Sequence, residues 1–299
     1  ARHGLRAAPH TTADADRAHL RHAALTLLVH TDDDALHGAA LALLVRDPRT
    51  RSRYLPRALR RFTAGDPALP ASAPAEALGT HPELVLAAFA DRLHRPDPAG
   101  EVLRCLAEAT TPDLAHRVAT LVRDALEARP EAAGPAAAYI DRRLEQGPQA
   151  RTVLFPLVTR LLHSRPPEVR AALAPVLAAP GTAVSRPLRS DLLDVLLGQE
   201  RDPAVLESVL RSVARGAAGT GELPTRERVH RTALLLGRTP EGASRFNRCV
   251  VELARSDPGF AALLTGWLRD APQEWATLVG PSAARTLADL AAGGAPVPA

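Results

Sequence analysis

The chain has 299 residues and a formal net charge of +4, and 46% of its residues are hydrophobic, which is typical of a folded globular protein. All 37 of its basic side chains are arginine, and it contains no methionine. The absence of lysine excludes a P-loop lysine, the ATP-pairing lysine of a protein kinase and a Schiff base with pyridoxal phosphate. Because an initiator methionine is missing, we expect a fragment or a processed chain.

Alanine, leucine and arginine dominate the sequence and favour helices, whereas β-branched and aromatic residues are scarce. Apolar residues recur at intervals of three and four, as in Leu154, Leu157, Leu161 and Leu162, and a second leucine-rich segment spans 192–197. We therefore predict an all-α fold, an irregular α-solenoid of stacked antiparallel helical hairpins with about 14–16 helices.

At the N-terminus we expect residues 1–11 to be disordered, followed by a helical repeat domain over 12–292. Histidines are frequent in this region, and His19 and His22 lie one helical turn apart, so together they could supply half of a zinc shell. A zinc site needs three or four ligands in fixed geometry, and no H-E-x-x-H motif occurs. We predict no metal site and no cofactor.

The next segment, 46–62, is rich in arginine, and residues 1–61 contain 11 arginines against 6 acidic residues. The candidate anion- or partner-binding residues are Arg46, Arg49, Arg53, Arg57, Arg60 and Arg61. Four of them follow a helical spacing, and the planar guanidinium suits phosphates and carboxylates. Two observations favour an ordinary solvated face instead: Pro56 would kink or split the helix, and a chain without lysine must use arginine for its surface charge.

Proline marks the starts of several predicted helices. It follows a potential capping residue in Asp47-Pro48, Asp97-Pro98, Thr111-Pro112, Asp202-Pro203, Thr239-Pro240 and Asp257-Pro258. The cap oxygen accepts an unpaired N–H of the first turn, and proline at the first helical position removes only a donor that has no partner. Prolines also recur at intervals of 18 residues, as in Pro112, Pro130, Pro148 and Pro166, and two such intervals predict a helical-hairpin period of roughly 34–40 residues.

Two stretches rich in proline and glycine, 64–82 and 216–224, interrupt this rhythm, and we expect loops or hinges there. We expect the last residues, 293–299, to form a flexible tail.

The pattern L-L-x-R-[DT]-P-x-x-x-S-R-[YF] occurs at 43–54 and again at 235–246, which indicates an internal repeat. The segment 165–177, RPPEVRAALAPVL, reads like the second helix of a HEAT unit. Over about 12–292 the chain therefore resembles the HEAT and armadillo-like class of α-solenoids, although several units are shorter, which leaves a less regular helical array as the alternative. The resemblance implies stacked antiparallel helices with a concave partner surface, and it implies no catalytic residues.

Cys105 and Cys249 lie within apolar helical patterns, which favours buried thiols in a reducing compartment, and we expect a cytoplasmic protein. No uncharged run reaches the ~18 apolar residues of a membrane helix. No G-x-S-x-G motif occurs, and the glycines of 216–221 lack the strand-to-helix setting of a phosphate cradle. We therefore expect no enzymatic activity.

These features predict a non-catalytic protein–protein interaction or scaffold module of a larger protein, with another protein as its partner. The alternative is an α-solenoid that binds nucleic acid or another polyanion through the Arg46–Arg61 face.

Overall fold

The computed structural model describes residues 10–96, 100–146, 151–216 and 222–293. Every regular element in these ranges is helical: there are 17 α-helices, one 3-10 helix and no strand. The prediction of an all-α fold is confirmed. Two of the helices, α4 (Ser72–Ala75) and α17 (Pro272–Trp275), are single turns, which is why the number of helices exceeds the predicted one.

The chain divides into two compact units, Ala1–Pro135 and Ala136–Ala299, where the sequence predicted one repeat domain over 12–292. Of the predicted disordered ends, residues 1–9 and 294–299 lie outside the described residues, whereas His10, Thr11 and Gly293 lie in helices. Most of the predicted hinge 216–224 also lies outside them.

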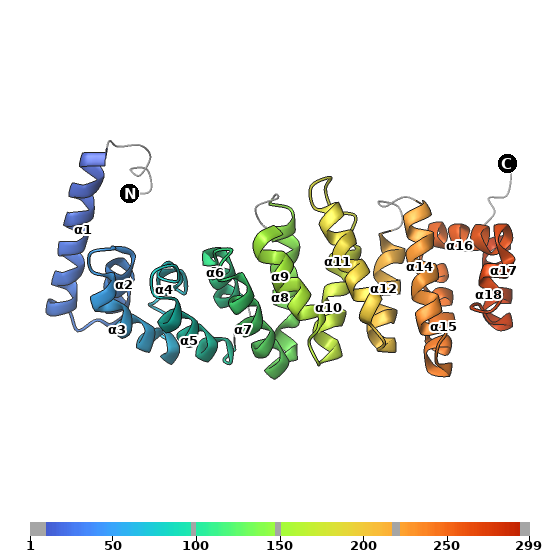
Figure 1. Ribbon diagram of the computed structural model, residues 1–299, viewed down its shortest axis with the longest axis horizontal. Coiled ribbons are helices and arrows are strands. Elements are labelled where there is room, and N and C mark those ends of the chain that lie inside the picture. The colour runs from blue at the N-terminus through green and yellow to red at the C-terminus, as the bar shows by residue number, and fades with distance from the viewer. Residues whose placement is uncertain (1–9, 97–99, 147–150, 217–221, 294–299) are drawn as a thin grey trace. The chain divides into compact units, whose positions relative to one another are not determined.

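The helices of the first unit are α1 (His10–His30), α2 (Asp34–Arg46), α3 (Arg51–Ala64), α4, α5 (Pro82–Leu93), α6 (Glu101–Ala109), α7 (Ala115–Ala128) and the 3-10 helix η1 (Pro130–Ala132). Helix α2 packs against α4 and α4 against α6, while α3 packs against α5 and α5 against α7 (Figure 1). Neighbours within each of these two layers are thus separated by one helix in the chain. Stacked helical hairpins produce this order, and the solenoid itself stays a prediction.

The second unit contains α8 (Ala133–Leu144, whose first residues belong to the first unit), α9 (Arg151–Leu162), α10 (Pro167–Ala178), α11 (Arg186–Gln199), α12 (Pro203–Arg215), α14 (Glu222–Leu236), α15 (Pro240–Ser256), α16 (Pro258–Asp270), α17 and α18 (Pro281–Gly293). Helices α10, α12, α15 and α18 contact one another in succession, and α9 contacts α11 (Figure 1). One helix separates α9 from α11 and α10 from α12, as in the first unit, whereas two helices separate α15 from α18.

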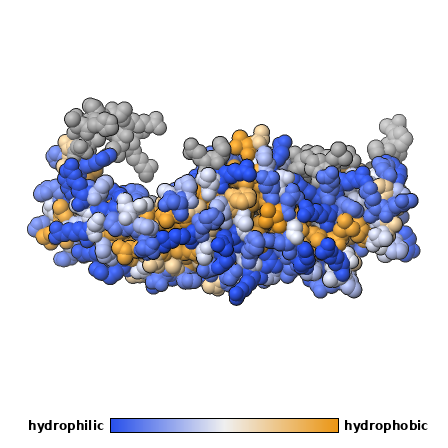
Figure 2. Space-filling model, viewed as in Figure 1, coloured by the Kyte–Doolittle hydropathy of each residue, from blue (hydrophilic) through white to orange (hydrophobic). Residues whose placement is uncertain are grey.

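Leucine, alanine and valine form the cores. The eight leucines of 154–162 and 192–197 that the periodicity placed on apolar faces are all exposed by 2% or less, so this prediction is confirmed. Burial of these side chains supplies the main stabilising contribution of such helices. On the face that Figure 2 shows, hydrophobic surface forms separate patches between wider hydrophilic areas.

Three of the predicted proline starts are capped as expected. The side chains of Asp202, Thr239 and Asp257 accept hydrogen bonds from backbone N–H groups in the first turns of α12, α15 and α16. Pro48 and Pro112 instead lie in turns, because α3 and α7 begin three residues after them. Asp97-Pro98 falls outside the described residues.

Arginine side chains bind backbone carbonyl groups at two junctions between consecutive helices, which we call arginine joints. Arg51 donates to the carbonyl oxygens of Val45 (2.9 Å) and Arg46 (3.1 Å) at the end of α2. In the same register Arg170 donates to the carbonyl oxygens of Ser164 (2.5 Å) and Arg165 (2.9 Å) after α9. Each guanidinium reaches back five and six residues, to the last two carbonyls of α2 in one case and to two carbonyls of the linker after α9 in the other.

The stretch 64–82, which we expected to be a loop or a hinge, carries α4 and buries several side chains, among them Leu69 and Leu78. It passes so close to α2 that a Cβ atom added to Gly38 would lie 2.5 Å from the Cβ atom of Ala68. Only glycine fits at that contact. The segment is therefore packed against α2, and a hinge within it stays a prediction.

Candidate partner-binding surface

Helix α3 determines how the predicted arginines are displayed. It continues through Pro56 as one helix, although we expected the proline to kink or split it. Pro56 is the sixth residue of α3 and is exposed, so the single backbone hydrogen bond that it removes lies near the solvated start of the helix. Arg53, Arg57 and Arg60 follow at i, i+4 and i+7 and share one exposed face. Arg49 lies in the turn before α3.

Two of the six predicted arginines are engaged within the first unit. Arg46 lies 2.9 Å from a carboxylate oxygen of Glu76. Arg61 bridges Asp34 and Asp66, with 3.4 Å to Asp34. These two guanidinium groups link α2 and α3 to the segments beside them, so their charge is largely neutralised internally.

The other four, Arg49, Arg53, Arg57 and Arg60, are exposed, and within the described ranges none of them has an ion-pair partner. The guanidinium carbon of Arg53 lies 5.6 Å from the ring centroid of Tyr54, a cation–π contact that limits the mobility of this side chain. We call these four residues the arginine row.

Arginines on comparable helices elsewhere are paired with glutamates of neighbouring helices. Arg117 of α7 holds Glu83 of α5 through two hydrogen bonds of 2.8 Å. In the second unit, Arg245 of α15 lies 3.2 Å from Glu207 of α12. Arg245 occupies the position of Arg53 in the internal repeat, yet Arg53 has no carboxylate partner. Arg53 thus lacks the pairing that Arg117 and Arg245 have.

The arginine row concentrates positive charge locally, although the first unit as a whole carries no net positive charge. Residues 1–135 contain 17 arginines and 17 acidic residues, so the formal charge of this unit is zero. The excess of the first 61 residues is offset by the acidic residues of 62–135. The electrostatic field that such an arrangement creates is confined to the neighbourhood of α3.

The histidines considered as metal ligands are both exposed, and the Nδ1 atom of His19 lies 2.8 Å from the carbonyl oxygen of Ala15 in its own helix. Among the residues whose positions are described, no group of three or more histidine, cysteine, aspartate or glutamate side chains could hold a metal ion.

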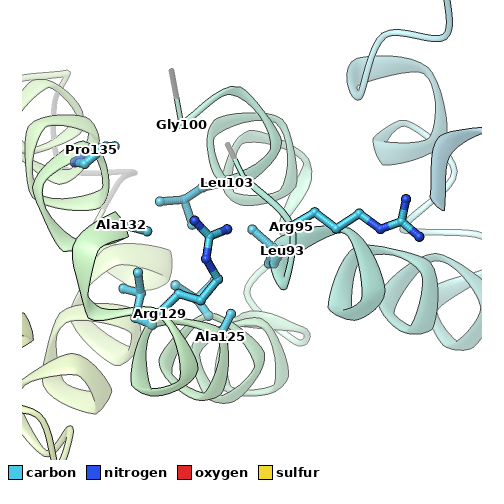
Figure 3. Close-up of a pocket in the computed structure, with 10 residues that line it drawn as sticks. Leu93, Arg95, Gly100, Leu103, Ala125, Arg129, Ala132 and Pro135 are labelled. Atoms are coloured by element: carbon cyan, nitrogen blue, oxygen red, sulfur yellow. The ribbon is translucent and has the colours of Figure 1, made fainter. Parts of the chain in front are cut away.

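A hollow between α5, α6 and α7 is lined mostly by apolar residues, including Leu93, Leu103 and Ala125 (Figure 3). Its volume is about 30 Å³, which is room for one or two water molecules. Figure 3 shows the guanidinium of Arg129 extending across the hollow, whereas Arg95 extends away from it. This hollow is too small for an organic substrate.

The second unit contains a polar cluster around the buried Arg189 that sequence reasoning missed. Arg189 of α11 lies 2.8 Å from Asp141 of α8 and 2.6 Å from Glu145, which directly follows α8. The hydroxyl group of Ser185 donates to Glu145 at 2.8 Å, and Ser185 is only 1% exposed. Arg189 and Ser185 are buried and engaged with these partly exposed carboxylates, so the cluster joins helices. Sequence spacing gives no signal for it, because the partners are about forty residues apart.

No helix in the described ranges is long and apolar enough to span a membrane. No protein-family model, no curated protein and no solved structure matches the chain.

Proposed function

We propose that the chain is a non-catalytic protein–protein interaction module of the HEAT- and armadillo-like α-solenoid kind, which binds an acidic segment of a partner protein through the arginine row. The observation that carries this proposal is the exposed, unpaired state of Arg49, Arg53, Arg57 and Arg60, in a fold that pairs arginines with glutamates on neighbouring helices. Carboxylates of a partner would complete the same pairing that Glu83 and Glu207 provide internally.

The neutral charge of the first unit favours a short acidic segment over a nucleic acid. A nucleic acid presents a phosphate every few ångströms and gains affinity from an extended basic surface. Beyond the arginine row it would meet the acidic excess of residues 62–135. A peptide with a few carboxylates can contact the row alone, which supports a protein partner.

The test is the affinity of a fluorescein-labelled oligoglutamate peptide, measured by anisotropy for the wild-type chain and for a variant with Arg49, Arg53, Arg57 and Arg60 changed to alanine. Because an exposed ion pair contributes about 0.2–1 kcal/mol, loss of four should weaken binding about fourfold or more. All four side chains are exposed, so the variant should keep the helical circular dichroism of the wild type.

A matched control variant removes the same charge from the second unit, with Arg142, Arg160, Arg238 and Arg255 changed to alanine, all of them exposed. Its affinity for the peptide should lie within about twofold of the wild-type affinity, because screening by salt limits the effect of a charge to its own neighbourhood. Equal loss in both variants would show non-specific attraction and overturn the proposal. If a single-stranded or duplex oligonucleotide bound more tightly than the peptide and depended on the arginine row, the nucleic-acid alternative would replace it.

A further inference from the structure

A groove between α1 and α2 lies next to the arginine row in the chain. It has a volume of about 300 Å³, and its walls come from Arg17, Leu20 and Arg21 of α1 and from the segment 43–48, the end of α2 and the turn after it. The next residue in the chain is Arg49, the first member of the row. A volume of this size accommodates a large apolar side chain together with part of its backbone.

Apolar side chains that the fold leaves uncovered line this groove and continue along α2. Leu20 is 53% and Leu43 is 37% exposed, and Leu36, 42% exposed, lies two turns before Leu43 on the same face of α2 with the exposed Ala39 between them. The opposite side of α2 is buried through residues such as Leu41 and Val45. A helix that is apolar all round is normally covered all round, so the face of Leu36 and Leu43 lacks a partner.

The rim of the groove carries a net positive charge once the ion pairs within the chain are counted. Asp47, the only acidic residue that lines it, is bound by Arg21 at 2.8 Å. Burial alone would raise the pKa of Asp47, but the Arg49 N–H and the Arg21 guanidinium outweigh it and hold that pKa below its ordinary value. Arg17 and Arg49 are exposed and have no ion-pair partner in the described ranges. The rim therefore attracts carboxylates while the floor is apolar.

We infer that this groove anchors a large apolar side chain of the acidic partner segment, with flanking carboxylates on Arg17 and Arg49. This inference rests on the proposed function and specifies the partner: a peptide segment in which an aliphatic or aromatic residue interrupts a run of acidic residues. A concave site suits one side chain, whereas a lipid surface would require apolar side chains that protrude. Burial of an apolar side chain in the groove adds affinity to the ionic contacts of the arginine row.

The experiment uses two labelled glutamate-rich peptides that differ only at the centre, where one carries phenylalanine and the other alanine. The wild-type chain should bind the phenylalanine peptide about tenfold more tightly. Leu43→Gln, a change at an exposed position, should reduce the ratio of the two peptide affinities towards one. Leu234→Gln, at an exposed leucine of the second unit, is the matched control and should leave the ratio unchanged. Circular dichroism confirms that both variants remain folded.

The outcomes separate this inference from the proposed function. A ratio near one for the wild-type chain, or a ratio that Leu43→Gln does not change, overturns the groove as an anchor even if the arginine row still governs both affinities. Loss of the arginine row should weaken the binding of both peptides and leave the ratio of their affinities unchanged. If neither peptide binds, both proposals fail, and binding only to phosphatidylserine vesicles would also overturn both.

Discussion

Arg189 and Glu145 form an ion pair, in which the guanidinium donates to a carboxylate oxygen at 2.6 Å; the Arg189 side chain is 3% exposed and the Glu145 side chain 32%. The same guanidinium also donates to the carbonyl oxygen of Val176 near the end of α10. One side chain of α11 thus binds α8 and α10. An arginine so deeply buried depends on all of these acceptors, because an unpaired charge in the interior is strongly destabilising.

This pair makes the stability of the second unit sensitive to acid. Burial alone would raise the pKa of Glu145, but hydrogen bonds from Arg189, Ser185 and Thr182 outweigh it and lower that pKa to about 2. Because the folded pKa lies below the unfolded one, near 4.5, the contribution is complete above the unfolded value and is lost as the pH falls from there towards about 2.

We therefore expect Glu145→Gln to lower the free energy of unfolding by about 1–3 kcal/mol at neutral pH, because Arg189 loses a charged acceptor. The difference from the wild type should shrink as the pH is lowered towards about 2. Urea unfolding at a series of pH values measures this. Glu227→Gln, at an exposed residue of α14, is the control, and an equal effect of both changes would contradict the prediction.

Leu161→Ala should be strongly destabilising. Leu161 is 1% exposed in α9, and removal of such a side chain leaves a cavity that costs about 2–5 kcal/mol. The buried Trp267 and Trp275 both belong to the second unit, so their emission follows its unfolding. Leu234→Ala, at a 49% exposed leucine, should change the midpoint little, and a loss below about 0.5 kcal/mol for Leu161→Ala would be inconsistent with its burial.

The contribution of the capping residue of α12 to the free energy of unfolding can be measured by substitution. The side chain of Asp202 accepts hydrogen bonds from the N–H groups of Ala204 (2.8 Å) and Val205 (3.4 Å). Asp202→Ala should cost about 0.5–2 kcal/mol in chemical unfolding, and Asp202→Ser should recover most of the loss, because serine also caps helices. If serine proved as damaging as alanine, a role other than capping would be indicated.

The thiol of Cys249 should be inert in the folded chain. Burial raises its pKa to about 12, although the neighbouring Arg211 opposes this shift. Since the thiolate is the reactive form, a disulfide reagent at neutral pH should label Cys249 only after denaturation. Ser256→Cys, at an exposed position, provides the reactive control. Labelling of Cys249 at a similar rate without denaturant would show that α15 opens readily.

Features that depend on neighbouring residues were accessible from the sequence. The leucine periodicity of 154–162 identifies a buried face, and the proline after Asp202 identifies a capped start, because both act within one or two turns. The engagement of Arg46 was not accessible, because its partner Glu76 lies thirty residues away, and nothing in the spacing distinguishes it from Arg49. Likewise Gly38 in a helical pattern does not reveal that Ala68 passes against it. Such pairings are decided by how helices pack.

The arginine joints after α2 and α9 are local in their carbonyl contacts, although Arg51 also donates to Thr80 and Arg170 also donates to Glu200. Arg51 and the carbonyls that it closes lie within seven consecutive residues, and so do Arg170 and its acceptors. Neither joint borrows a hydrogen bond to these carbonyls from a distant part of the chain. A gene duplication that copied one helical hairpin would therefore carry these carbonyl contacts along with it, whereas the partner about thirty residues later would have to come from the segment that follows.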